Sequence, residues 1–283
     1  MFADEGMLGA WHFDPVTVIA LLTAGSVYAV ALGRARANGR VVRRARVAWW
    51  YAGIAALAVA LVSPLEALAD RSFAFHMAQH LMLTLVAAPL IALGAPIWMA
   101  LSAMPATAAR RLARALAGRA VAVLSHPVVG WTSFIGVSWG VHYSPLFDVA
   151  LTSSVWHVLE HVVWVTSALI YWVPIVGVDP SPHPLGFPAR LLSLVLAMPA
   201  MSFLALAIFT AEEPLYPTYA STPSPLDMSA LADQRAAGVT MWLLGNVALV
   251  VAVLTVAAAW KRHDDDRQRR EDARLDALLA SGA

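Results

Sequence analysis

The chain has 283 residues, of which 60% are hydrophobic and only 13% are charged, and its mean hydropathy is +0.67. A soluble domain carries about 25% charged residues, so this composition predicts a chain that lies mostly in lipid. The net charge of +1 argues against a nucleic-acid-binding protein, which needs a basic surface to contact phosphates. The absence of cysteine excludes disulfide frameworks, thiolate zinc fingers, iron–sulfur clusters and thiol copper relays.

Hydrophobic stretches long enough to cross a bilayer, which takes about 20 apolar residues per helix, occur seven times along the chain. Prolines and Ser-Pro pairs separate them, as is typical of loops between spans. The sequence therefore predicts an all-α polytopic membrane protein, a bundle of seven transmembrane helices. The expected spans are residues 16–33, 47–63, 73–96, 121–141, 155–176, 189–209 and 237–260.

The basic residues lie almost entirely on one side of these spans. Seventeen of the 19 Lys and Arg residues fall in the first and third loops, after the fifth span and in the C-terminal tail, which leaves Arg71 and Arg235 on the other side. Cytoplasmic loops carry an excess of Lys and Arg, so we expect the C-terminus in the cytoplasm. The N-terminus, with Asp4, Glu5 and Asp14 but no basic residue, is expected outside, and it lacks the basic region that begins a signal peptide.

Two units are expected along the chain. Residues 1–260 form the transmembrane domain of seven helices, and residues 261–283 form a charged cytoplasmic tail. The tail, rich in Asp and Arg, is predicted to be a solvated helix or a disordered segment that anchors the topology.

Two histidine pairs lie near the predicted outer face. His76 and His80 begin the third span, in FAFHMAQHLML, and His157 and His161 begin the fifth, in WHVLEHVVW. Side chains four residues apart share one face of a helix, about 5–6 Å apart at Cβ, so each pair offers two nitrogens to one ion. His142 ends the fourth span at the same depth. Because ionisable residues inside a membrane are costly and mark functional sites, these five histidines predict a metal site.

The donor types narrow the choice of metal. Imidazole suits copper, zinc, iron and nickel, and copper(I) also accepts thioether sulfur. Met77 lies inside the first histidine pair and Met241 lies in the outer half of the seventh span. Glu160 lies inside the second pair, and three roles stay open for it: a metal ligand, a partner that fixes an imidazole tautomer, or a general base.

Other interpretations of the same residues stay open. His157, Glu160 and His161 match the H-x-x-E-H pattern of inverted zinc peptidases, in which two histidines bind zinc and the glutamate activates water. A haem held by one histidine from each of two helices, or a cluster that is only hydrogen-bonded, would also use these side chains. The further carboxylate that a zinc peptidase needs would come from Glu212, Glu213 or Asp233.

Several segments resemble the CtaG family of cytochrome c oxidase assembly factors, which are seven-span bacterial membrane proteins. These segments are HMAQHLMLTLVAAPLIALGAPI in the third span, WGVHYSPLFDVAL and WHVLEHVVWVTSALIYWVPI around the fourth and fifth, and LYPTYA and DQRAAGVTMW before the seventh. The resemblance covers about residues 40–260, and the histidine-bearing segments are its most specific part.

The resemblance implies a membrane assembly factor that handles copper for the metal centres of haem–copper oxidases. It implies a non-enzymatic protein of the bacterial inner membrane whose site faces the periplasm, with oxidase subunits as clients and a periplasmic copper donor as a further partner. The main alternative is an intramembrane zinc-dependent hydrolase built on the H-x-x-E-H pattern. The expected metal ligands are His76, His80, His142, His157, His161 and Glu160, with Met77, Met241 and Asp233 as accessory residues.

Polar residues before the seventh span are expected to have structural roles. Asp233 is positioned to cap the N-terminus of that helix, where carboxylates are favoured. Tyr216 and Tyr219 are typical of an aromatic anchor at a membrane interface, with contact to a docking partner as the alternative.

His126 and His183 lie beside prolines at the cytoplasmic side, and a structural role is expected for both.

Overall fold

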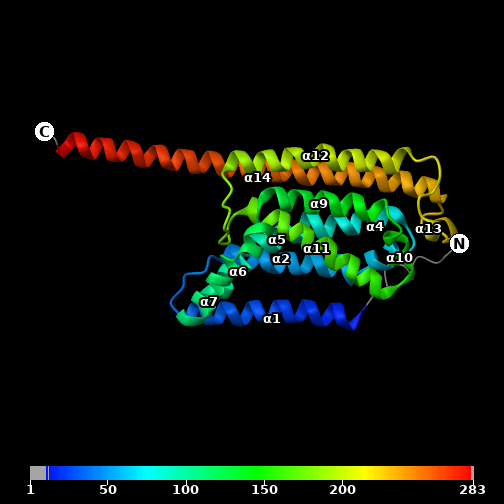
Figure 1. Ribbon diagram of the computed structural model, residues 1–283, viewed down its shortest axis with the longest axis horizontal. Helices are drawn as coiled ribbons and strands as arrows, with labels where there is room; N and C mark the ends of the chain where they lie inside the picture. The colour runs from blue at the N-terminus through cyan, green and yellow to red at the C-terminus, as the bar shows by residue number, and fades with distance from the viewer. Residues whose placement is uncertain (1–10, 12, 282–283) are drawn as a thin grey trace.

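The protein is an elongated bundle of helices from which the last helix projects at one end (Figure 1). The computed structural model describes residue 11 and residues 13–281, so Asp4 and Glu5, which entered the orientation argument, lie outside the described residues. Every regular element within the described residues is a helix, which confirms the all-α prediction.

Long helical segments form the body of the bundle, and shorter helices connect them. The long ones are α1 (Pro15–Ala37), α2 (Arg44–Leu61), α9 (Pro127–His142), α11 (Ser154–Val176), α12 (Phe187–Thr210) and α14 (Ala230–Ser281). A further segment runs from α4 (Phe73–Leu81) through the π-helix η1 (Met82–Ala87) to α5 (Ala88–Leu93), and α6 (Pro96–Ala103) follows it. The connecting helices are α3 (Pro64–Ala69), α7 (Ala106–Leu116), α8 (Arg119–Leu124), α10 (Leu146–Thr152) and α13 (Pro217–Ser221).

Five helical segments of the described chain are long and apolar enough to cross a membrane: Pro15–Ala37, Phe73–Ala103, Ser154–Val176, Phe187–Thr210 and Ala230–Leu279. The second expected span corresponds to α2, which has 18 residues and begins with an Arg-Ala-Arg segment. The fourth expected span, 121–141, is not one helix, because α8 ends at Leu124 and α9 begins at Pro127. Proline has no N–H to continue a helix and restricts the residue before it. The count of seven spans stays a prediction.

The helices pack in a consistent order across the bundle. In Figure 1, α12 and α14 run side by side along one edge, α1 lies along the opposite edge, and α9, α11, α5 and α2 lie between them. A buried core of aliphatic and aromatic side chains joins α4, α9, α11, α12 and α14. The outward faces of α1, α12 and α14 expose large apolar side chains such as Ile19, Phe203 and Leu254, as expected for a surface in contact with a membrane.

Glycine residues let neighbouring helices approach closely, as is common in membrane proteins. A methyl group placed on Gly238 of α14 would lie 2.9 Å from the carbonyl oxygen of Ala205 in α12. One placed on Gly130 of α9 would lie 2.9 Å from the carbonyl oxygen of Ile170 in α11. A larger residue at either position has to push the two helices apart.

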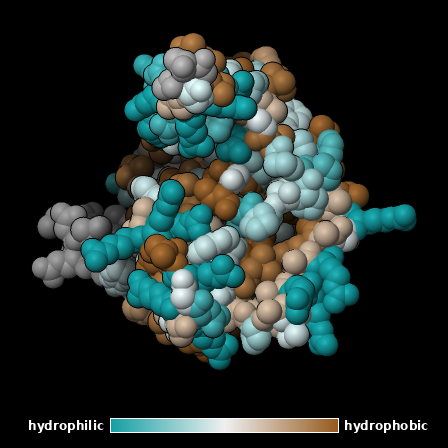
Figure 2. Space-filling model, turned by 90° about the vertical axis from the view of Figure 1, so that its left-hand side faces the viewer, coloured by the Kyte–Doolittle hydropathy of each residue, from teal (hydrophilic) through white to brown (hydrophobic). Residues whose placement is uncertain are grey.

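The two ends of the bundle carry different elements and charges. α10, α13 and the start of α4 gather at one end, which we call the histidine end because His76, His80, His142, His157 and His161 lie there. The tail end, from which α14 projects, carries hydrophilic side chains around its rim (Figure 2). Exposed arginines of the first and third expected loops are Arg34, Arg36, Arg40, Arg43, Arg44, Arg110, Arg111, Arg114 and Arg119.

α14 continues past residue 260 without a break as far as Ser281. The expected boundary between residues 1–260 and 261–283 therefore lies inside one helix, and the division into two units stays a prediction. Of the two forms expected for the tail, the structure has the solvated helix, whose side chains are mostly exposed. Arg267 and Glu271 form an ion pair on it at 2.9 Å.

We expect Gly238→Ala to destabilise the bundle by about 1–3 kcal/mol, because the new methyl group overpacks the contact between α12 and α14. The measurement is thermal unfolding of the detergent-solubilised protein, followed by circular dichroism. Gly136→Ala is the matched control, because a methyl group at Gly136 of α9 meets nothing within 4 Å, and its stability should stay within about 1 kcal/mol of the parent. Equal melting temperatures for the two variants would contradict the close approach of α12 and α14.

Candidate metal centre

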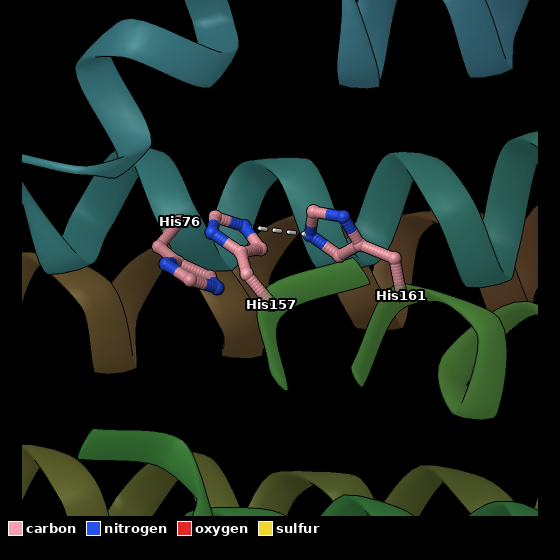
Figure 3. Close-up of side chains that lie close together, drawn as sticks. All are labelled: His76, His157 and His161. Carbon is pink, nitrogen blue, oxygen red and sulfur yellow. Dashed lines mark hydrogen bonds between the residues drawn. The ribbon is translucent and has the colours of Figure 1, made fainter. Parts of the chain in front are cut away.

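The four paired histidines meet between the first turns of α4 and α11. His76, His80 and His161 are buried and His157 is half-buried. The ring centroids of His76 and His157 lie 5.8 Å apart, and those of His80 and His161 lie 6.0 Å apart. Figure 3 shows His76, His157 and His161 close together between the two helices. The two pairs are therefore parts of one cluster.

A carboxylate from a distant part of the chain fixes the start of α4. Asp233 accepts a hydrogen bond from the hydroxyl of Ser72 at 2.7 Å and another from the backbone N–H of Phe73 at 2.7 Å. The prediction that Asp233 caps its own helix is therefore wrong. It lies in α14 but caps α4, whose first N–H groups have no partner within the helix. This cap holds the turn that carries His76.

Tyr219 determines which nitrogen of His76 carries the hydrogen. The Tyr219 hydroxyl donates to the backbone carbonyl of Ala69 at 2.7 Å, so its oxygen accepts a hydrogen bond from Nδ1–H of His76 at 2.8 Å. Burial raises the pKa of Tyr219 well above its ordinary value, which keeps the phenol protonated. With its hydrogen on Nδ1, neutral His76 presents the lone pair of Nε2 to the cluster.

Tyr216 and Tyr219 are both buried, at 4% and 6% exposure. Tyr216 donates its hydroxyl hydrogen to the carbonyl of His142 at 2.9 Å. The prediction that these two tyrosines form an anchor at the membrane interface is therefore wrong. The hydroxyls of both tyrosines donate to backbone carbonyls at the histidine end, those of His142 and Ala69. These hydrogen bonds hold the loop that carries the tyrosines over that end.

His80 and Glu160 lie at the inner side of the cluster. Nε2 of His80 is 2.9 Å from Nε2 of His76 and 3.6 Å from Oε1 of Glu160, which also accepts a hydrogen bond from Trp164 at 3.2 Å. Within the described residues, Nδ1 of His80 and Oε2 of Glu160 are buried and have no hydrogen-bond partner. Buried polar atoms are nearly always paired, so each of these two atoms is available to bind a hydrogen-bond partner or a cation.

The donor atoms are close enough to share an ion. Nε2 of His157 lies 3.2 Å from Nε2 of His161 (Figure 3). His76, His157 and His161 each offer one nitrogen within 4.8 Å of the others, and His76, His80 and Glu160 form a second such group. Metal–nitrogen distances are about 2.0–2.1 Å, so ligand atoms at this spacing can surround one ion.

Two carboxylates that the sequence reasoning missed lie beside His157. Oε1 of Glu66 is 3.5 Å from its Nε2, and Oδ1 of Asp70 is 3.9 Å from its Nδ1. Gln79 of α4 donates to the other oxygen of Glu66. Burial, together with the nearby Asp70, raises the pKa of Glu66 to about 8. The signal in the sequence was an acidic pair at i and i+4, in PLEALAD, shortly before the third span.

His142 faces a sulfur atom rather than the other histidines. Its Nδ1 lies 2.7 Å from the carbonyl oxygen of Ser138, and because a carbonyl only accepts, Nδ1 carries the hydrogen. Neutral His142 therefore directs the lone pair of Nε2 toward Sδ of Met77, 3.3 Å away. Thioether sulfur is also an acceptor, so the two atoms face each other without a hydrogen between them. Both atoms are ligands that copper(I) favours.

Aromatic rings close the cluster off from the rest of the bundle. The ring of Phe147, which is fully buried, lies 4.9 Å from that of His76 and 5.4 Å from that of His142. The ring of Trp164 lies 4.7 Å from that of His80. Met241 is buried in the same apolar core as Met77. Apolar walls of this kind lower the local dielectric constant, which strengthens electrostatic interactions beside them.

Similar sequences occur in mycobacteria. The chain is 28% identical over 282 residues to an uncharacterized protein of Mycobacterium bovis and, by the same measure, to one of Mycobacterium tuberculosis. It is 27% identical over 278 residues to an uncharacterized protein of Mycobacterium leprae. These alignments cover 97%, 97% and 95% of the chain but only 43%, 43% and 42% of the relatives, so the chain spans less than half their length.

No solved structure matches the chain. A family of proteins does match it, over residues 26–263, under the description cytochrome c oxidase caa3 assembly factor (Caa3_CtaG). That range includes all five histidines of the histidine end, Glu160, and Tyr219, which orients His76. The chain therefore belongs to the cytochrome c oxidase caa3 assembly factor family.

Proposed function

We propose that this assembly factor binds copper through the histidine cluster and passes it to the metal centres of the oxidase, without catalysing a reaction. The clients are oxidase subunits in the same membrane, and a periplasmic copper donor supplies the ion. The proposed ligands are His76, His80, His142, His157, His161 and Glu160.

The observation that carries this proposal is the fixed orientation of the imidazole rings. Tyr219 takes the hydrogen of Nδ1 in His76, and the Ser138 carbonyl takes that of Nδ1 in His142. Each ring therefore directs a lone pair of Nε2 toward other donor atoms, which is how metal-binding histidines are oriented in proteins. Hydrogen bonding alone can satisfy Nε2 of His76, which lies 2.9 Å from Nε2 of His80. At His142 it leaves Nε2 facing Sδ of Met77, two acceptors without a hydrogen between them.

The contact between His142 and Met77 supports copper over zinc. Zinc is bound by imidazole, thiolate and carboxylate, whereas thioether sulfur selects copper(I). The 3.3 Å contact joins Nε2 of His142 and Sδ of Met77 beside the larger histidine cluster. Met241 and Asp233 are not proposed as ligands, because Met241 packs in the apolar core and Asp233 caps α4.

We further propose seven spans in the bacterial inner membrane, with the histidine end facing the periplasm. α2 and α9 would complete the seven with the five longer segments, because each packs inside the bundle beside a longer helix. The basic side chains support this orientation, since they gather at the tail end and cytoplasmic segments are rich in Lys and Arg. In this orientation the copper site lies near the compartment from which the oxidase receives the ion.

The zinc hydrolase is the weaker alternative for the same residues. Its general base has to reach a metal-bound water, and the base must be within hydrogen-bond distance of the proton that it takes. Glu160 is only 8% exposed, and its Oε1 accepts a hydrogen bond from Trp164. This position favours a carboxylate that binds the ion or orients His80.

The orientation predicts the position of a reporter fused after Ala283. A reporter that is active only in the cytoplasm should be active there, because the basic residues hold the tail end on that side. A reporter that requires export should be inactive at the same position. Export-dependent activity after Ala283 would contradict the placement of the histidine end in the periplasm.

We expect His76→Ala/His80→Ala to abolish copper retention, because this change removes two ligands of one cluster at once. The detergent-solubilised protein is desalted, and the amount of copper bound per chain is then measured by inductively coupled plasma mass spectrometry. The matched control is His126→Ala/His183→Ala, which removes another close histidine pair, with ring centroids 5.3 Å apart. The control should retain copper as the parent does, and unchanged retention in the first variant would refute the shared site.

Glu160→Gln separates a copper carrier from a hydrolase. Loss of a residue that orients a ligand weakens affinity by about 10–100-fold, so cells with this variant should recover cytochrome c oxidase activity when copper is added to the medium. Loss of a general base costs about 10²–10⁴-fold in rate, and added metal does not restore it. Oxidase activity that stays absent at every copper concentration, while the variant still binds metal, would favour the hydrolase.

A further inference from the structure

Donor atoms at the histidine end form a series of overlapping groups rather than one closed set. Glu66, Asp70 and His157 form a group whose atoms lie within 4.8 Å of one another. His157 also belongs to the group with His76 and His161, and His76 belongs to the group with His80 and Glu160. Each group thus shares one histidine with the next. An ion held by one group is already in contact with a ligand of the following group.

Exposure falls along this series. The side chain of Asp70 is 49% exposed, those of His157 and Glu66 are 14% and 11% exposed, and those of Glu160 and His80 are 6% and 4% exposed. The first group therefore reaches water, whereas the last one is enclosed by Trp164 and Phe147. Of the first and last donor groups in the series, only the first is open to an ion that arrives from solution.

We propose that Glu66, Asp70 and His157 form an outer cation site that receives the ion from water and transfers it to the buried histidines. This inference rests on the proposed function, since it concerns how the same copper site is loaded. Transfer proceeds by exchange of ligands: His161 and His76 bind the ion as the oxygens of Asp70 and Glu66 release it. The oxidation state of the ion does not change, and any proton on a coordinating carboxyl group passes to water as the ion binds and returns as the ion leaves.

The chemistry of the outer group suits a first contact with a hydrated ion. Carboxylate oxygens suit hydrated divalent cations, and imidazole suits copper and zinc. Carboxylates near a mouth lined with low-dielectric walls also raise the local concentration of cations and the rate of association. At the inner end, the unpartnered Nδ1 of His80 and Oε2 of Glu160 belong to residues that are more than nine-tenths buried. The series therefore runs from a site that captures quickly to a site that is protected from water.

The test compares the rate of loading with the final amount of bound ion. Full-length protein in detergent is mixed in a stopped-flow instrument with Cu²⁺ held by a chromogenic chelator, and release from the chelator is followed. We expect Glu66→Gln/Asp70→Asn to lower the loading rate by at least about tenfold, with the same copper per chain at equilibrium. The single variant Asp70→Asn changes an exposed residue and should lower the rate in the same direction without affecting the fold.

The matched control is Glu212→Gln/Glu213→Gln, which removes two exposed carboxylates of the loop after α12. It should load at the parental rate. Equal rates for the outer-site variants and the parent would overturn the proposal, and so would an equal slowing in the control, which would indicate general attraction by charge. If the parent itself binds no copper, the proposed function fails before the loading route is in question.

Discussion

A polar group inside an apolar bundle is costly unless a hydrogen-bond partner lies beside it, because water does not reach it there. At the histidine end, Tyr219 and the carbonyl of Ser138 meet this requirement for one nitrogen of His76 and one of His142. The opposite nitrogen of each ring is thereby left as a lone pair. The hydrogen bonds that make burial of these rings tolerable also determine which of their atoms can bind a cation.

This requirement connects parts of the chain that are far apart. The segment between α12 and α14 supplies Tyr219 to His76, and the first turn of α14 supplies Asp233 to the start of α4. Gln234, next to Asp233, accepts a hydrogen bond from the backbone of Leu215 at 2.7 Å and so fixes the same segment at its base. A change in this loop would therefore alter the histidine cluster without replacing any of its histidines.

The features that the sequence predicted well are local. Pairs at i and i+4 share a helix face whatever the tertiary structure, so the convergence of His76 with His80 and of His157 with His161 followed from spacing alone. Asp233 was assigned to the wrong helix because its partners lie about 160 residues away. Glu66 was missed because an acidic pair in a short connecting helix is a weak signal until the fold places it beside His157.

The distribution of donors also bears on how firmly an ion would be held. A structural metal site is closed, with four ligands in a fixed geometry, and it releases its ion slowly. Here the donors form groups of three that share members, and His80 and Glu160 each keep one buried atom without a partner among the described residues. Among the described residues, each of these groups of three supplies fewer than the four ligands of a structural site. An ion in such an arrangement could change position by exchanging one ligand at a time, which the proposed delivery of copper to an oxidase would require.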